Sequence, residues 1–240
     1  MSRIEEALTK ASQGERLGIS TPVAPIPAPL APDESSEFSY LSSVNTNLQL
    51  ALAEVERPVL AFASAVPKEG VSTVVFHLAR LMAKDRRVLV VDFNVGGPRL
   101  HKLFQTDNIK GLSDILHGRK TLDDCLVETG VPNVHLLPCG PTGHAPLQIL
   151  GSAPIKRVLA ELRARYDWVL IDCPPLRKHP ETAILASLCD GVVLVVRALK
   201  TRRELVKYSQ GLLEKAGARQ VGVVLNRVKH WIPDFIYRRL

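Results

Sequence analysis

The sequence predicts an α/β fold in which a parallel β-sheet is sandwiched between helices. Three observations predict this class. Six apolar runs rich in β-branched residues recur along the chain, the runs are nearly continuous rather than alternating with polar residues, and amphipathic segments separate them. Apolar strands joined by helical crossovers are typical of a parallel sheet that is buried on both faces.

The elements follow from this pattern in chain order. The expected strands occupy residues 59–63, 87–93, 133–138, 168–175, 191–197 and 220–228. The expected helices between them occupy residues 72–84, 111–118, 147–164, 180–188 and 201–216. Ligands of such a sheet bind beyond the carboxyl ends of the strands. The candidate site loops are therefore residues 64–73, 92–99, 138–146, 172–180 and 197–203.

Two segments of a different character come before this pattern. Residues 1–14 place apolar side chains on one face, behind a capping-box spacing, and this predicts a short amphipathic helix. Residues 15–36 are rich in proline, which excludes a helix or a central strand and predicts an extended linker. The linker is either a tether for a docking helix or a simple leader. A helix expected over residues 38–55 then opens the main domain, residues 37–240.

Composition narrows the class of protein. The chain has 31 Lys and Arg against 24 Asp and Glu, a net charge of +7 and a pI near 9.4. This balance suits an anionic partner such as a nucleotide, a nucleic acid or a membrane surface, although an ordinary soluble basic surface gives the same balance. No apolar run approaches the roughly 20 residues that span a bilayer, and the N-terminus is no signal peptide. Work at a membrane would therefore require another chain as the anchor.

The cysteines favour a reduced, cytoplasmic protein. They lie far apart and form no CxxC pair, which argues against a zinc site and against a disulfide scaffold. The four are Cys125, Cys139, Cys173 and Cys189.

The stretch AVPKEGVST, residues 65–73, follows the first expected strand and opens a helix. A strand, a glycine turn and hydroxyls at a helix start are the parts of a P-loop, whose backbone N–H groups converge on phosphate. A working P-loop has a lysine before the hydroxyl residue, but Val71 stands there, before Ser72 and Thr73. Loss of one such charge-assisted contact weakens binding by about 1.5–3 kcal/mol. Three readings stay open: the backbone N–H groups still bind phosphate without the lysine, Lys68 swings back to replace the charge, or the turn binds no phosphate.

Two acids end apolar strands near this loop. Asp92 is followed two residues later by Asn94, an amide where a second acid would complete a metal or base pair. Asp92 either reaches Mg²⁺ through water or caps the next turn. Asp172 ends the run YDWVLID in the Walker B arrangement, in which an acid orients Mg²⁺ and its waters. Ser72, Asp92 and Asp172 are thus the candidate Mg²⁺ residues, provided that a nucleotide binds.

Two further loops are expected near the site. Residues 137–146 form a Gly- and Pro-rich loop at a strand end, and we expect this loop to rim the site. Asn226, at the end of the last strand, either reads an adenine edge or forms a turn. The expected nucleotide-contacting residues are Lys68, Glu69, Gly70, Val71, Ser72, Thr73, Asn226 and Arg227.

These motifs carry a family resemblance. In order they read AVPKEGVST, VLVVDFNVGGP, LPCGPTGHAPLQILGS, YDWVLIDCPP and GVVLNRV. From about residue 37 the chain resembles the bacterial tyrosine kinases (BY-kinases) of capsule and exopolysaccharide loci, which are relatives of the MinD/ParA P-loop ATPases. The opening MSRIEEALTKA looks like the N-terminus of a subgroup found with exopolysaccharide and exosortase systems. The resemblance implies a kinase domain that binds ATP with Mg²⁺ and docks on a membrane polysaccharide co-polymerase.

The chain departs from the family pattern in four places. The family's PGEGKST is here PKEGVST, and its DADLRRP is here DFNVGGP, without the second acid and both arginines. The ring-forming Glu-x-x-Arg-x-x-Arg pattern is replaced by Ser39, Ser42 and Asn45. The C-terminal tyrosine cluster, the family's site of mutual phosphorylation, is reduced to Tyr237.

Three functions are compatible with these departures. The first is a pseudokinase: a non-catalytic, cytoplasmic regulator of exopolysaccharide synthesis that docks on the co-polymerase and meets the inner membrane only through that partner. It would bind no nucleic acid and would form a monomer or dimer rather than a ring octamer. The second is an atypical ATP-binding autokinase or ATPase that uses Asp92, Asp172 and Ser72. The third is a MinD/ParA-like positioning protein, which the basic run within residues 197–207 and the tail 231–239 suggest.

Overall fold

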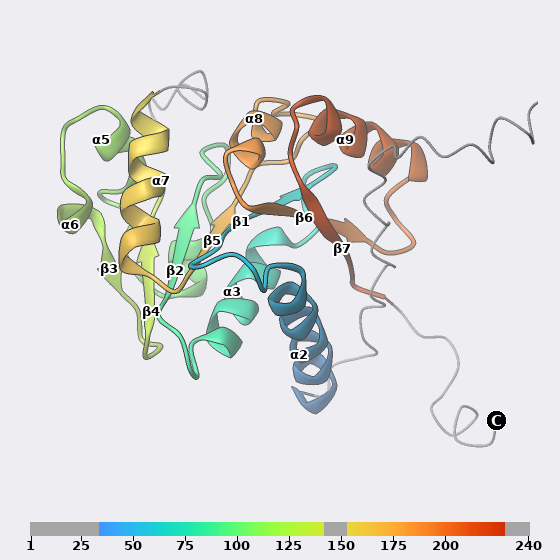
Figure 1. The fold of residues 1–240 in the computed structure, drawn as a ribbon, viewed down its shortest axis with the longest axis horizontal. Helices are drawn as coiled ribbons and strands as arrows, with labels where there is room; N and C mark the ends of the chain where they lie inside the picture. The colour runs from blue at the N-terminus through green and yellow to red at the C-terminus, as the bar shows by residue number, and fades with distance from the viewer. Residues whose placement is uncertain (1–33, 142–152, 229–240) are drawn as a thin grey trace, which may run out of the picture.

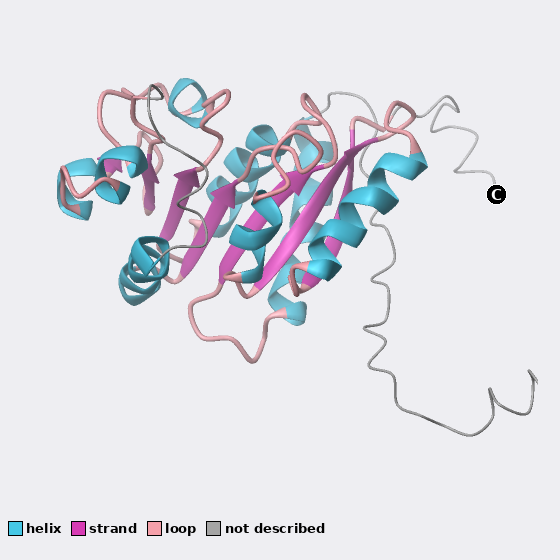
Figure 2. Ribbon diagram, turned by 90° about the horizontal axis from the view of Figure 1, so that it is seen from above, coloured by secondary structure: helices cyan, strands magenta, loops and turns pink. Residues whose placement is uncertain are grey.

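The fold is a mostly parallel sheet covered by helices, as the sequence predicts. A computed structural model describes residues 34–141 and 153–228 of the chain. Within these ranges a seven-stranded sheet has the order β3-β4-β2-β5-β1-β6-β7. All neighbouring strands pair in parallel except β3 and β4, which are antiparallel. Figure 2 shows the twisted sheet between its two helical layers.

The six predicted strands are confirmed. β3 was missed, because two residues are too short to show a periodic pattern. The strands are β1 (Val59–Ser64), β2 (Val88–Asp92), β3 (Val127–Glu128), β4 (Val134–Leu137), β5 (Trp168–Asp172), β6 (Gly191–Arg197) and β7 (Gln220–Asn226).

The helices predicted between the strands are present, and two four-residue helices, α4 and α6, were missed. The first helix starts earlier than expected. It begins at Glu34, inside the range assigned to the linker, because the polar run after Asp33 suits a helix N-terminus. The predicted N-terminal helix and the linker up to residue 33 lie outside the described residues. The helices are α2 (Glu34–Ala51), α3 (Val71–Met82), α4 (Leu100–Leu103), α5 (Leu112–Leu116), α6 (Leu122–Cys125), α7 (Ala153–Arg165), α8 (Thr182–Ser187) and α9 (Arg203–Lys215).

The sheet separates two apolar cores. Successive side chains of a strand point to opposite faces, so β1 contributes to both. Val59, Ala61 and Ala63 join the core beneath α5 to α9, whereas Leu60 and Phe62 join the core beneath α2 and α3. Figure 1 shows α2 beside α3, with α8 and α9 together on the other side of the sheet.

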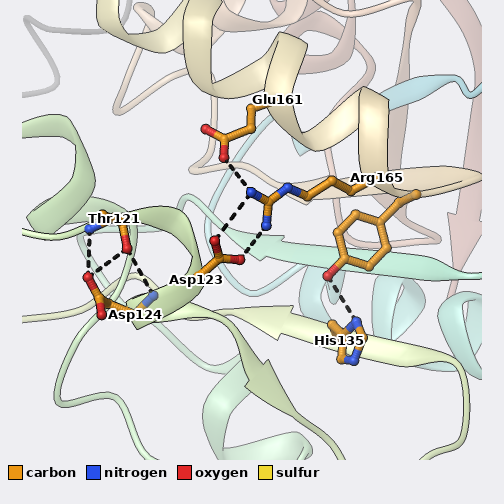
Figure 3. Close-up of polar contacts among 7 residues, drawn as sticks. Thr121, Asp123, Asp124, His135, Glu161 and Arg165 are labelled. Atoms are coloured by element: carbon orange, nitrogen blue, oxygen red, sulfur yellow. Dashed lines mark hydrogen bonds and ion pairs between the residues drawn. The ribbon is translucent and has the colours of Figure 1, made fainter.

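Polar contacts fasten α7 to the β3–β4 edge of the sheet (Figure 3). Arg165, at the end of α7, donates to the carboxylate of Asp123 on α6 and to Glu161 one turn back, at 2.9 Å. The Tyr166 hydroxyl lies 2.9 Å from Nδ1 of His135 on β4. The ion pairs are solvated and add at most about 1 kcal/mol each, so they orient this edge more than they stabilise it.

Two further features concern membrane-spanning helices and cysteine thiols. Among the described residues, no helix is long and apolar enough to cross a membrane. All four cysteines are free thiols, and Cys125, Cys139 and Cys173 are buried.

Removal of a core side chain from the central strand should destabilise the whole domain. Leu170 on β5 has no exposed surface, so Leu170→Ala should lower the free energy of unfolding by about 2–5 kcal/mol. The matched control is Leu50→Ala on α2, where the side chain is 70% exposed and the change should stay within about 0.5 kcal/mol. Urea unfolding of both variants measures the difference, and equal effects would contradict the assignment of the core.

Candidate functional site

The loop after β1 has the backbone shape of a P-loop. Lys68 (φ 68°) and Gly70 (φ 98°) both adopt the left-handed conformation, and α3 begins at Val71. At Gly70 a Cβ atom would lie 2.1 Å from Nδ2 of Asn226, so this position requires glycine. The tight turn before the helix is therefore retained without the usual lysine.

Side-chain hydrogen bonds of Asn226 and Glu69 hold this loop in place. Nδ2 of Asn226 donates to the backbone carbonyl of Glu69 at 2.9 Å. The Glu69 carboxylate is buried and accepts the Val66 N–H at 3.0 Å through Oε2. Its Oε1 accepts the Arg197 N–H at 3.1 Å and the hydroxyl of Thr201. The sequence predicted both residues as nucleotide contacts, whereas their side chains here form bonds within the protein.

Val71 occupies the position of the missing lysine. Its side chain is only 8% exposed and belongs to the apolar core beneath α2 and α3. It cannot supply positive charge to a phosphate. The helix start that would meet the phosphate therefore presents backbone amides and hydroxyls only.

Asp92 and Asp172 lie side by side beneath the loop, as register partners of β2 and β5. The Ser72 hydroxyl donates to Oδ2 of Asp172 at 2.5 Å. Oδ1 of Asp172 is buried and has no hydrogen-bond partner among the described residues. Burial is the main cause that raises the pKa of Asp172 well above its usual range, and the charge of Asp92 raises it further.

Asp92 caps the turn that follows its own strand. Oδ1 accepts the Asn94 N–H at 3.1 Å, and Oδ2 accepts the N–H groups of Arg99 at 3.0 Å and Leu100 at 3.1 Å. Of the two roles predicted for Asp92, these hydrogen bonds therefore match the one in which the carboxylate caps the next turn. Burial raises the pKa of Asp92 to about 6, although the three backbone bonds oppose the shift.

A cavity of about 300 Å³ opens above the loop. Asp92, Asp172, Asn226 and Arg227 do not line it, whereas Ser72 and four basic side chains do. Arg99, Lys178 and His179 were missed as individual residues, although they fall in the predicted loops 92–99 and 172–180. The basic lining residues are Lys68, Arg99, Lys178 and His179, and the other predicted lining residues are Glu69, Gly70, Val71, Ser72 and Thr73.

The described part of loop 137–146 does not line the cavity. None of the residues up to Pro141 lines the cavity. The loop instead accepts hydrogen bonds from the start of α5, with Leu112 N–H to Pro138 O at 2.8 Å and Ser113 N–H to Cys139 O at 3.0 Å. Residues 142–146, Tyr237 and the tail 231–239 lie outside the described residues.

The titration of Asp92 gives a pH test of this geometry. Between pH 3.8 and about 6 the folded state keeps a proton that the unfolded chain releases. The free energy of unfolding should therefore fall as the pH rises through this window, by about 3 kcal/mol for Asp92. Asp92→Asn removes this ionisation, so its urea unfolding should show a smaller fall between about pH 4 and 7. An unchanged slope would show that Asp92 titrates normally.

Comparisons with known proteins identify the family and agree with the fold. A family model described as "AAA domain" matches residues 61–204. The tyrosine-protein kinase CpsD of Streptococcus agalactiae is 30% identical over 198 residues, which are 82% of this chain and 86% of CpsD. The tyrosine-protein kinase wzc of Salmonella typhimurium is 31% identical over 190 residues, which are 78% of this chain but only 26% of wzc.

Solved structures extend the comparison. The kinase domain of the Escherichia coli tyrosine kinase ETK superposes with a TM-score of 0.79 at 27% identity, over 82% of this chain and 78% of that chain. MinD from Pyrococcus horikoshii shares the fold, with a TM-score of 0.60 at 23% identity over 76% of each chain. The chain therefore belongs to the bacterial tyrosine-protein kinase family, whose fold is that of the MinD-like P-loop proteins.

Proposed function

We propose that this chain is a non-catalytic member of its family, a pseudokinase that regulates exopolysaccharide synthesis and export. The observation that carries the proposal is Val71. In place of the phosphate-binding lysine, an apolar side chain packs into the core at the start of α3. Phosphoryl transfer depends on cations at the transferred group, because negative charge shifts onto its oxygens.

The side-chain oxygen atoms that remain at this site are better ligands for a magnesium ion than for a phosphate. The Ser72 hydroxyl and the unpartnered Oδ1 of Asp172 are oxygen ligands of the kind that Mg²⁺ takes. With Val71 beside them, a nucleotide would lose one charge-assisted contact, which weakens binding by about 1.5–3 kcal/mol. ATP or ADP with Mg²⁺ is therefore a weak ligand in this proposal, and no residue has an assigned catalytic role.

The proposed partner is the cytoplasmic segment of a membrane polysaccharide co-polymerase. Support comes from wzc, in which the region similar to this chain makes up about a quarter of a longer protein. The present chain would make the same kind of association from the cytoplasmic side and would reach the inner membrane through its partner. Ser42 and Asn45 on α2 replace the charged ring contacts, which supports a monomer or dimer rather than an octamer.

A second candidate is an atypical ATP-dependent enzyme. The observation that favours it is the basic lining of the cavity by Lys68, Arg99, Lys178 and His179. Any of the Lys68, Arg99 and Lys178 side chains would restore positive charge at the phosphate if it moved toward a bound nucleotide. The second candidate requires Asp172 for activity and predicts phosphorylation of Tyr237, whereas the pseudokinase requires neither.

Assays of phosphorylation separate the two candidates. Purified full-length protein with ATP and Mg²⁺ should accumulate no phosphotyrosine and should release phosphate no faster than the Asp172→Ala variant, because the transition state lacks its lysine. An active kinase of the family serves as the positive control. Phosphotyrosine on Tyr237 that disappears in Asp172→Ala would establish the enzyme and overturn the pseudokinase.

Complementation tests the role in the cell. Deletion of the gene should reduce the exported polymer, and wild type and Ser72→Ala should restore it equally, because a scaffold does not need the magnesium ligand. Polymer is measured per cell, with immunoblots to match protein levels. Restoration by wild type but not by an equally abundant Ser72→Ala would show that nucleotide chemistry is needed.

A further inference from the structure

A second hollow lies on the other side of the P-loop, away from the α3 helix start. It measures about 470 Å³ and is bounded by the loops that follow β1, β5 and β6. We call it the basic pocket, because five cationic side chains line it. These are Lys68, Arg177, Arg197, Lys200 and Arg202.

Among the described residues, no side chain pairs with these five cations. In residues 34–141 and 153–228, none of the five forms an ion pair or donates a side-chain hydrogen bond. Of the described acids, Glu69 alone lines the pocket, and its two oxygens already accept the Val66 and Arg197 N–H groups and the Thr201 hydroxyl. The described lining therefore carries five cationic side chains against one carboxylate, so the pocket is positively charged.

Internal bonds fix the rims of the basic pocket relative to one another. Glu69 joins the loop after β1 to the loop after β6, through its bonds to Arg197 and Thr201. The loop after β5 is joined to the same P-loop, because the Arg177 N–H donates to Ala65 O at 3.2 Å. The backbone of the loops that carry the cations is thus preorganised, so a ligand would have to order only their side chains on binding.

The N-terminus of α9 adds a positive electrostatic potential to the pocket. It is 13 residues long and begins at Arg203, and no side chain caps its first amides. Arg202, the residue before it, and Leu205 in its first turn both line the pocket. The absence of a side-chain cap at Arg202 and the positive end of the helix dipole favour an anion at this position.

We propose that the basic pocket is a second anion site, next to the nucleotide cavity and sharing Lys68 with it, that binds a phosphate monoester. Three arginines supply planar donor forks, which match phosphate oxygens better than lysine does. Pro67 and Leu205 give the rim an apolar side, which suits a phosphate carried on an aromatic ring, as in phosphotyrosine. The site goes beyond the proposed function and stands whether or not the chain is catalytic.

Calorimetry on the full-length protein tests the site with two probes, O-phosphotyrosine and inorganic phosphate. The variant Lys200→Gln/Arg202→Gln removes two pocket cations and should weaken binding roughly tenfold or more. Lys207→Gln/Lys215→Gln is the matched control, because it removes the same charge from exposed positions of α9 outside the pocket. The control should keep the wild-type affinity within about twofold, since exposed charges at a distance are screened.

Each outcome bears on the proposal. Tighter binding of phosphotyrosine than of phosphate supports it and identifies an aromatic carrier, whereas equal binding supports it with free phosphate as the ligand. An equal loss in both double variants would reveal only a diffuse basic surface and would overturn it. Absence of binding of either probe at millimolar concentration would overturn it as well.

Duplex DNA that binds more tightly than both probes, with a steep salt dependence, would reassign the surface to nucleic acid. None of these results changes the test of the pseudokinase, which depends on ATP and Asp172.

Discussion

Strand β5 pairs with β1 on one side and with β2 on the other, and this order decides which loops meet at the site. Because parallel strands end at the same edge, the order places Asp92 and Asp172 beside each other beneath the P-loop. Two carboxyl groups in a buried position are costly, and their raised pKa values reflect that cost. Asp92 offsets it with three backbone N–H donors, and Asp172 offsets part of it with Ser72.

The P-loop is held by the protein itself rather than by a ligand. Glu69 and Asn226 bond the turn to the ends of β6 and β7, and two left-handed residues, Lys68 and Gly70, give it its shape. Bonds of this kind keep a loop in place after the lysine is lost, since none of them uses the lysine. The same Glu69 carboxylate lies between the nucleotide cavity and the basic pocket, so one buried group shapes both.

Much of this arrangement could be predicted from the sequence, for a physical reason. Strands buried on both faces leave continuous apolar runs, and all six long strands were found from them. The short elements β3, α4 and α6 leave no such pattern. The P-loop and the two acids lie at the strand ends where the sequence placed them. The hydrogen-bond partners of Asp92 and Asn226 could not be decided from the sequence. Those partners come from other loops, so three-dimensional packing rather than local sequence decides them. For the same reason Arg99, Lys178 and His179 became visible only once the loops were brought together.

The central claim is that Val71, buried where a lysine would meet phosphate, leaves the nucleotide cavity without effective affinity. The most direct test is calorimetry of ATP and ADP with Mg²⁺ on wild type and on Val71→Lys. A lysine stem can follow the apolar path of Val71 while its ammonium group reaches the cavity. We predict that wild type shows no binding up to millimolar nucleotide, whereas Val71→Lys binds. Micromolar binding by wild type would contradict the claim and would make the nucleotide a switch or a substrate of this protein.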